Sequence, residues 1–124
     1  EMNGQVYQFN FGMGFLREIN KTTTVPVKDI PGKVTNMGMQ YAFAELLDGN
    51  VETLCDVLYI ANKSQSPRLT KAAIDTYIDD EGTDIDTLFD QVIDFLKNTN
   101  ATKKETQTVL KRVAEAQEQK NQEK

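Results

Sequence analysis

The chain contains no histidine, and this absence excludes several classes of active site. Catalytic triads, histidine general bases and histidine-ligated zinc sites all need an imidazole. The single cysteine, Cys55, has no partner for an internal disulfide, and it lies in an apolar stripe of helical spacing, which predicts a buried, inert thiol. The pair Gly12-x-Gly14 lacks the further glycine and lysine of a phosphate-binding loop. We therefore expect no enzyme activity, no metal and no cofactor.

Positive charge and long apolar runs are also scarce. Fourteen Lys and Arg residues face nineteen Asp and Glu residues, a net charge of -5, so duplex nucleic acid is not an expected partner. No apolar run approaches the roughly 20 residues of a membrane helix, and no basic start followed by an apolar stretch indicates a signal peptide. A length of 124 residues predicts one domain, and we expect it in the cytoplasm.

The hydrophobic period changes within the first twenty residues. Aromatic residues alternate over Val6–Phe11, which predicts a half-buried strand, and the spacing over Phe15–Ile19 predicts one face of a helix. Gly12 lies at the changeover. Upstream, Asn3-Gly4 is typical of a two-residue hairpin turn.

Helical periodicity dominates the remainder of the chain. Residues 22–35 contain two prolines and read as a connection, in which Val25, Val27 and Ile30 allow an extended piece beside the first strand. A second helix is predicted from about Asn36 to Asp48, ending at Gly49. A third helix is expected to be capped by Asn50, and a fourth by Ser66, with Pro67 in its first turn and Gly82 at its end. A fifth helix is expected to start at Thr83 or Asp84, and a sixth at a Thr102-Lys-Lys-Glu105 capping box.

These patterns predict a mainly α fold, a compact helical domain of five to six helices with a short N-terminal β-hairpin or strand. We expect the packed domain to cover residues 1–101. Residues 102–124 are expected to form a weakly packed helix and a tail that is disordered from 117. This C-terminal part has a net charge of +2, against -7 for residues 1–101.

Methionines and aromatics near the N-terminal half are candidates for partner binding. Methionine adapts its shape and is common on surfaces that accept helical partners, but such residues also fill ordinary cores. If the set lines a groove, polar substitution at Met13 or Met39 should weaken binding without unfolding; unfolding would indicate core. The candidates are Phe11, Met13, Phe15, Met37, Met39 and Tyr41, with Phe9 beside them.

A second candidate is an acidic stripe. Asp86, Asp90 and Asp94 recur every four residues and so share one helix face, opposite the apolar face. A calcium loop starting at Asp79 fails, because its sixth position is an aspartate where glycine is needed and its twelfth is not glutamate. The stripe is either a solvated face or a docking strip for a basic segment; reversing its charges would distinguish the two.

An ordered series of segments carries a family resemblance. The first is Phe11-Gly-Met-Gly-Phe-Leu-Arg-Glu-Ile-Asn20, followed by 38–49, 71–78 and 86–96. In this order they resemble the tail assembly chaperones of long-tailed phages that infect Gram-positive bacteria. The resemblance covers the chain to about Lys104. It is specific as an ordered series, whereas each single segment is a weak signal because none of them carries chemistry.

The resemblance implies a non-enzymatic function in phage tail morphogenesis. Members of that family bind the tape measure protein, a very long helical protein that sets tail length, and keep it soluble until tube subunits assemble around it. They are then absent from the virion. The family also implies a longer frameshifted form that recruits the tail tube protein, and many copies along one client favour self-association. Host cytoplasm is the expected location.

Two other classes compete with this interpretation. An acyl carrier would match in size and charge, but it needs Asp-Ser-Leu at a helix start, and here the nearest analogue is Asp86-Thr87-Leu88 inside a helix. A small acidic adaptor or antitoxin-like module shares the composition. It would form a stable stoichiometric complex with one protein instead of coating a long client.

Overall fold

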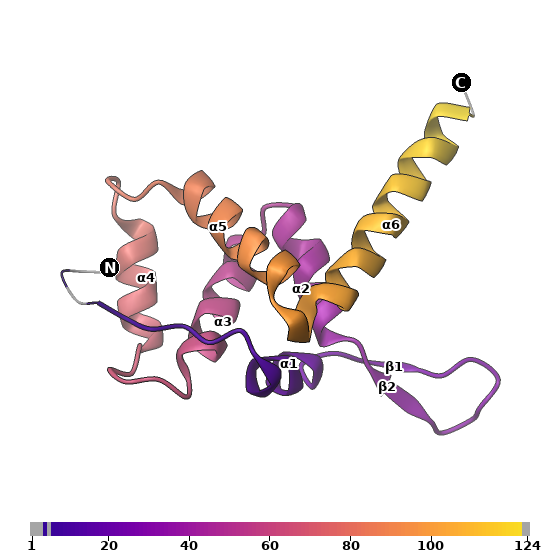
Figure 1. Cartoon of the computed structure of the whole chain (residues 1–124), viewed down its shortest axis with the longest axis horizontal. Coiled ribbons are helices and arrows are strands. Elements are labelled where there is room, and N and C mark those ends of the chain that lie inside the picture. The colour runs from indigo at the N-terminus through magenta and orange to yellow at the C-terminus, as the bar shows by residue number, and fades with distance from the viewer. Residues whose placement is uncertain (1–3, 5, 123–124) are drawn as a thin grey trace.

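Six helices and one pair of short strands make up the part of the chain that the computed structural model describes, residues 4 and 6–122 (Figure 1). In chain order they are α1 (Met13–Asn20), β1 (Thr24–Pro26), β2 (Val34–Asn36), α2 (Gly38–Leu47), α3 (Val51–Asn62), α4 (Lys71–Asp79), α5 (Ile85–Asn98) and α6 (Asn100–Gln122). The predicted fold class, mainly α with a short hairpin near the N-terminus, is confirmed.

Two predicted caps start their helices as expected. Asn50 accepts a hydrogen bond from the backbone N–H of Thr53 at the start of α3, and Asp84 accepts one from Thr87 at the start of α5, both at 3.1 Å. Each satisfies a backbone donor that the first helical turn leaves unpaired. Gly49, with a φ of 79°, follows α2 as its predicted end.

The prediction for α4 was wrong at both ends. The helix begins at Lys71, where Thr70 accepts a hydrogen bond from the Ala73 N–H at 3.1 Å, and it ends at Asp79 rather than at Gly82. Ser66 and Pro67 lie in the preceding loop. The physical reason is a tertiary contact, because a side chain at the end of α3 bonds to the backbone of residues 67 and 69 and holds them outside the helix.

The N-terminal segment 6–11 is not a strand, although its side chains alternate as predicted. Tyr7 and Phe9 are half-buried and Phe11 is buried, while the residues between them are exposed. Its backbone bonds to α3 instead of to a neighbouring strand: the Asn10 N–H donates to the carbonyl oxygen of Ala61 at 2.8 Å. The hairpin expected at Asn3-Gly4 lies outside the described residues, which include only its glycine.

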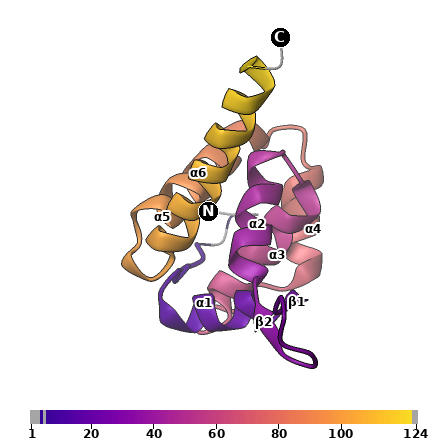
Figure 2. The ribbon, with the colours of Figure 1, turned by 90° about the vertical axis from the view of Figure 1, so that its right-hand side faces the viewer.

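The extended piece expected within 22–35 pairs with a neighbouring stretch rather than with the N-terminal segment. β1 and β2 are antiparallel, with Thr24 opposite Asn36 and Pro26 opposite Val34. Positive φ angles at Asp29 and Gly32 turn the chain back within a few residues, and a short loop closes at a lower entropy cost than a long one. The hairpin extends away from the helices in Figures 1 and 2.

Helices α2 and α3 pack on each other and supply much of the core; α1, α5 and α6 pack on α2, and α1 and α4 pack on α3. Figure 2 shows α2 with α6 at its side and α1 below it. In α2 and α3, the side chains of Met39, Phe43, Leu54 and Val57 are fully buried. Helices α1 and α2 meet at Gly38, where an added Cβ would lie only 1.7 Å from the carbonyl oxygen of Ile19. Only glycine permits this approach.

Helix α6 begins two residues before the predicted capping box. Thr102 is buried and its hydroxyl donates to the Leu96 carbonyl at 2.6 Å, so Thr102 and Glu105 cap nothing. Thr106 and Val109 continue the buried face of α6, which packs on α2 and α5. The helix continues to Gln122, where disorder was expected from 117, and its distal part projects from the body (Figure 1). The division into 1–101 and 102–124 stays a prediction.

No candidate membrane-spanning helix is present in residues 4 and 6–122. None of the helices there combines the length and the apolar character that crossing a bilayer requires.

Candidate functional site

The predicted methionine and aromatic set does not form one surface. Phe15 and Met39 belong to the core, with 4% and 0% of their surface exposed, so the core interpretation holds for them. Met13 on α1 and Tyr41 on α2 are about half exposed, at 49% and 46%. A polar substitution at Met39 is therefore expected to unfold the protein, and only Met13 remains a test of surface binding.

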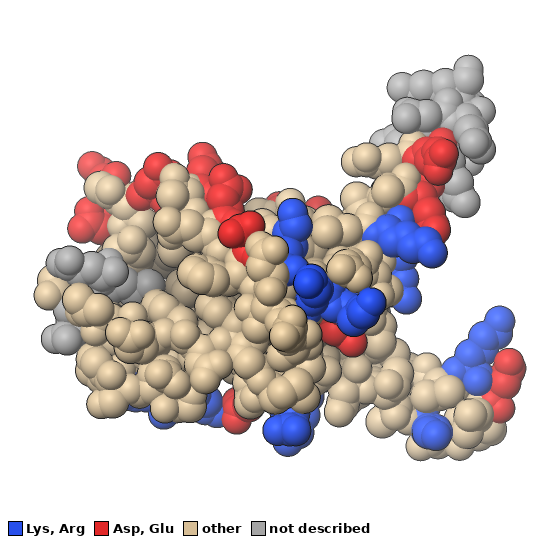
Figure 3. Space-filling view, in the orientation of Figure 1, with Lys and Arg blue, Asp and Glu red and all other residues tan. Residues whose placement is uncertain are grey.

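A groove of about 650 Å³ runs between the N-terminal segment and α5. Among residues 4 and 6–122, no side chain that lines it carries a charge, although 27% of the residues of the chain are charged. The space-filling view shows this face as an uncharged expanse, with acidic residues along its upper edge and basic ones near the base of α6 (Figure 3). We call it the aromatic groove; it is lined by Tyr7, Gln8, Phe9, Asn10, Phe11, Gly12, Leu58, Gln65, Tyr77, Leu88, Gln91, Val92, Phe95 and Thr99.

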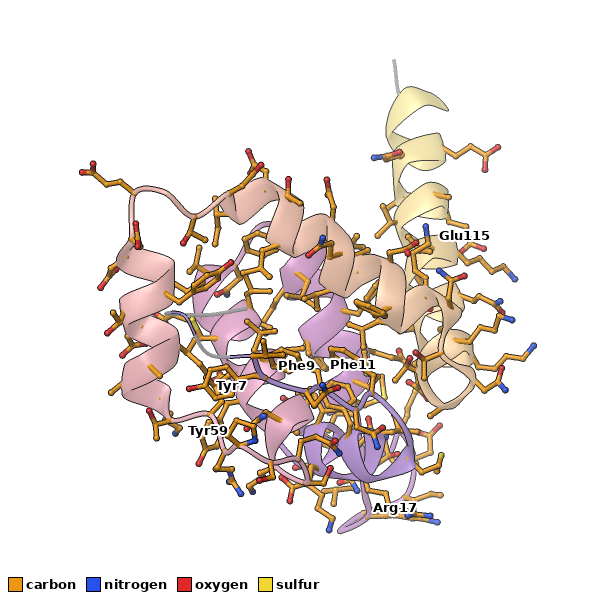
Figure 4. All side chains as sticks on the ribbon, turned by 60° about the vertical axis from the view of Figure 1, so that its left-hand side comes forward. Tyr7, Phe9, Phe11, Arg17, Tyr59 and Glu115 are labelled. Carbon is orange, nitrogen blue, oxygen red and sulfur yellow. The ribbon has the colours of Figure 1, made fainter. Side chains whose placement is uncertain are left out.

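Two phenylalanines that line the aromatic groove, Phe11 and Phe95, are in ring contact, and Phe15 packs against Phe11 from the core. Phe11 packs edge-on against Phe15 at a centroid distance of 5.2 Å and lies nearly parallel to Phe95 at 5.7 Å. Phe15 and Phe11 are buried, whereas Phe95 is 58% exposed. Tyr7, Phe9 and Phe11 follow one another along the N-terminal segment below α5 (Figure 4). The groove thus presents an aromatic ring that its own fold leaves uncovered.

Helical spacing places Phe95 beside the apolar face of α5, yet the structure leaves its side chain exposed. The apolar residues of α5 span a wide arc of the helix, and Val92 and Leu96 take the buried positions. Ile93 adds a further partly buried residue on another side. An apolar arc wider than one packing face is the signal that could have indicated an uncovered aromatic residue.

Asn62, at the end of α3, holds the wall of the aromatic groove in place. This side chain is fully buried. Its Nδ2 donates to the carbonyl oxygens of Gln8 at 3.0 Å and Pro67 at 3.1 Å, and its Oδ1 accepts from the Leu69 N–H. Sequence reasoning missed this residue. It continues the four-residue spacing of Leu54 and Leu58, and a polar residue at a core position is the signal that could have found it.

Met37 and Tyr41 line a different groove, of about 370 Å³, between α2 and α6. Across it lie Val109 and Val113. Gln40 joins the two helices: its Nε2 donates to the Oε2 atom of Glu105, and its Oε1 accepts from the Nη1 atom of Arg112, both at 2.8 Å. Because the two partners are seven residues apart on α6, these bonds fix the direction in which the helix leaves the body.

The acidic stripe is present on α5, where Asp86, Asp90 and Asp94 are all exposed. Asp94 accepts a hydrogen bond from Asn98 Nδ2 at 3.1 Å. The acids gather with those of the α4–α5 turn along the upper edge in Figure 3. They are separate from the aromatic groove, whose lining includes none of them.

Cys55 is half-buried on α3. Burial raises the pKa of its thiol, and the carboxylates of Asp75, Asp56 and Asp79 raise that pKa further. Because the thiolate is the nucleophile, a raised pKa favours an unreactive thiol. Within the described ranges, no group of three or more Asp, Glu or Cys residues has an arrangement that could hold a metal ion.

The family resemblance is supported by comparison with known proteins. A family model described as phage tail assembly chaperone protein, TAC, matches residues 1–111, most of the chain and about half of α6. Comparison with curated proteins and with solved structures gives no match. Because the family match covers far more than half of the sequence, the chain belongs to the phage tail assembly chaperone family.

Proposed function

We propose that this protein is a non-enzymatic chaperone that binds the tape measure protein and keeps it soluble in the host cytoplasm during tail assembly. It leaves before the virion is complete. Family membership supports a partner among the tail proteins, and the uncharged aromatic groove with its exposed Phe95 supports an apolar client. The groove is the single observation in the structure on which the proposal rests.

The aromatic groove suits one face of a helical client. An amphipathic helix presents apolar side chains three and four residues apart, and such anchors enter uncharged grooves between secondary-structure elements. Polar atoms in the groove come from amides, such as those of Gln8 and Gln91, and from hydroxyls, so no charge has to lose its water on binding. The ring of Phe95 would gain contacts that its own fold does not provide.

The net negative charge of the chain suits the second requirement of a chaperone, which is to keep the bound client soluble. A long apolar client in solution exposes surface that drives aggregation. Each bound copy would cover part of that surface and add five net negative charges, and net charge of one sign keeps the complex soluble. A longer form of the chain that recruits the tail tube protein would act on the same complex.

Co-expression with the tape measure protein of the same phage tests this function. Size exclusion with light scattering should give a soluble complex that holds many copies of this chain per client, with the client insoluble when it is expressed alone. A client that stays insoluble, while this chain elutes by itself, would overturn the proposal. A stable complex of fixed small stoichiometry with one other protein would favour an adaptor instead.

A further inference from the structure

A second groove, of about 430 Å³, lies on another side of α5 and shares no residue with the aromatic groove. We call it the acidic-rimmed groove. Its apolar lining includes Phe89 and Ile93 of α5 with Leu47 and Val51 at the α2–α3 turn, and its charged lining residues are Asp86 and Asp90. Leu47 and Val51 are 37% and 40% exposed, so apolar surface is open to a partner here.

The charges that surround this groove all have one sign in the segments that build it. Residues 34–62 and 72–96 contain no Lys or Arg. Besides Asp86 and Asp90, the exposed Asp48 and Glu52 flank the turn in the chain. Within residues 4 and 6–122, the only ion pair joins Lys63 and Glu18, so the two α5 carboxylates remain available to a cation from outside.

We propose that the acidic-rimmed groove binds an amphipathic helix of a partner protein that carries Lys or Arg residues beside its apolar stripe. Asp86 and Asp90 are four residues apart, which places them about 6 Å apart along the axis of α5. Basic residues one turn apart on a partner helix have the same spacing. The apolar stripe of that helix would cover Val51 and Leu47, and the basic residues would pair with the two carboxylates.

The C-terminal helix of a second copy is a poorer occupant. Residues 102–124 have a net charge of +2 as a whole, but in the part of α6 beyond its packed base, residues 111–118, Lys111 and Arg112 are balanced by Glu115 and Glu118. Val109 and Val113, the larger apolar residues on the side facing α2, already line the groove between α2 and α6. The structure therefore favours a separate basic helix over self-association at this site.

Model peptides test the proposal without the tail client, so its outcome is independent of the proposed chaperone function. The probe, called the lysine peptide, is an amphipathic helix of about five turns with a leucine stripe flanked by lysines. The comparison peptide, called the glutamate peptide, has glutamate at every lysine position. Affinity is measured by calorimetry at a salt concentration of about 0.15 M. Asp86→Lys with Asp90→Lys should weaken binding of the lysine peptide by about tenfold or more and should create binding of the glutamate peptide.

A matched control separates the groove from general charge attraction. Asp75→Lys with Asp79→Lys changes two exposed acids at the same spacing on α4 and alters the net charge equally. This control variant should bind the lysine peptide within about threefold of the unchanged protein. Equal loss in the two double variants would overturn the proposal, because binding would then follow net charge alone.

A second measurement locates the bound peptide in the unaltered protein. Methyl resonances of Val51 and Ile93 should shift on addition of the lysine peptide, while those of Val92 in the aromatic groove should not. Shifts confined to the aromatic groove would overturn the proposal. A peptide of residues 102–124 that binds this groove more tightly than the lysine peptide would also overturn it, in favour of a second copy of the chain.

Discussion

Replacing Phe95 by alanine separates client binding from folding more cleanly than any other single substitution in the aromatic groove. Phe95 is 58% exposed, so the fold covers about two-fifths of its surface. Full burial of a phenylalanine contributes about 1.5–3 kcal/mol, which makes the covered part worth about 1 kcal/mol. The stack on Phe11 adds about 0.5–1.5 kcal/mol. The free energy of unfolding should therefore fall by about 1.5–2.5 kcal/mol.

This loss is smaller than that expected for a core phenylalanine. Phe43 is fully buried, and its replacement by alanine should cost about 3–5 kcal/mol. If Phe95 is an anchor for the client, its loss should weaken binding by about 2 kcal/mol or more, which is about 30-fold. The Phe95→Ala protein is thus expected to fold and to fail in binding.

Two assays and one control decide the matter. Urea unfolding followed by circular dichroism gives the free energy of unfolding, and titration with labelled helical fragments of the tape measure protein gives affinity. Val34→Ala is the control, because Val34 is also 58% exposed but lies on β2, outside the aromatic groove. The reasoning is refuted if Phe95→Ala binds the fragments as the unchanged protein does, or if Val34→Ala loses as much affinity.

Three further predictions concern the framework of the fold. Gly38→Ala should destabilise the protein by more than roughly 3 kcal/mol, the cost of a severe core change, because the added Cβ would lie 1.7 Å from the Ile19 carbonyl oxygen. Gly14→Ala is the control: its added Cβ has no atom within 4 Å, so it should be neutral or stabilising in the same urea titration. Asn62→Ala should lower the free energy of unfolding by about 2–4 kcal/mol, since it leaves buried backbone groups unpaired, and hydrogen exchange should show faster exchange at the Asn10 amide. Hydrogen bonds from Thr87 lower the pKa of Asp84 in the folded state. The contribution of Asp84 to the free energy of unfolding is therefore complete above its unfolded pKa of about 4, and it is lost as the pH falls from there through the lower folded pKa. In thermal unfolding against pH, Asp84→Asn should keep the cap and lose that acid dependence, whereas Asp84→Ala should lose both; an unchanged pH profile in Asp84→Asn would contradict the assignment.

Helices and their caps follow from the sequence because the responsible interactions span one turn. Asn50 and Asp84 each bond to the backbone three residues later, and Gly49 supplies the positive φ that ends α2. Such contacts depend only on neighbouring residues, so they can be identified before any tertiary structure is known. The family resemblance likewise depends on the order of segments along the chain and was confirmed by the match to residues 1–111.

The aromatic groove could not be predicted from the sequence, because the residues that build it are far apart in the chain. The alternation at 6–11 indicates which side chains face inward, yet only the contact with Ala61 decides that the segment lies along α3 without a strand partner. Thr102 resembles a cap in sequence, but burial beneath the end of α5 gives its hydroxyl another acceptor. In the same way, Asn62 binds Gln8 across more than fifty residues. The sequence by itself therefore determined the helices, their local ends and the family. Tertiary structure alone decided which apolar residues remain exposed, because exposure depends on what the rest of the chain leaves uncovered.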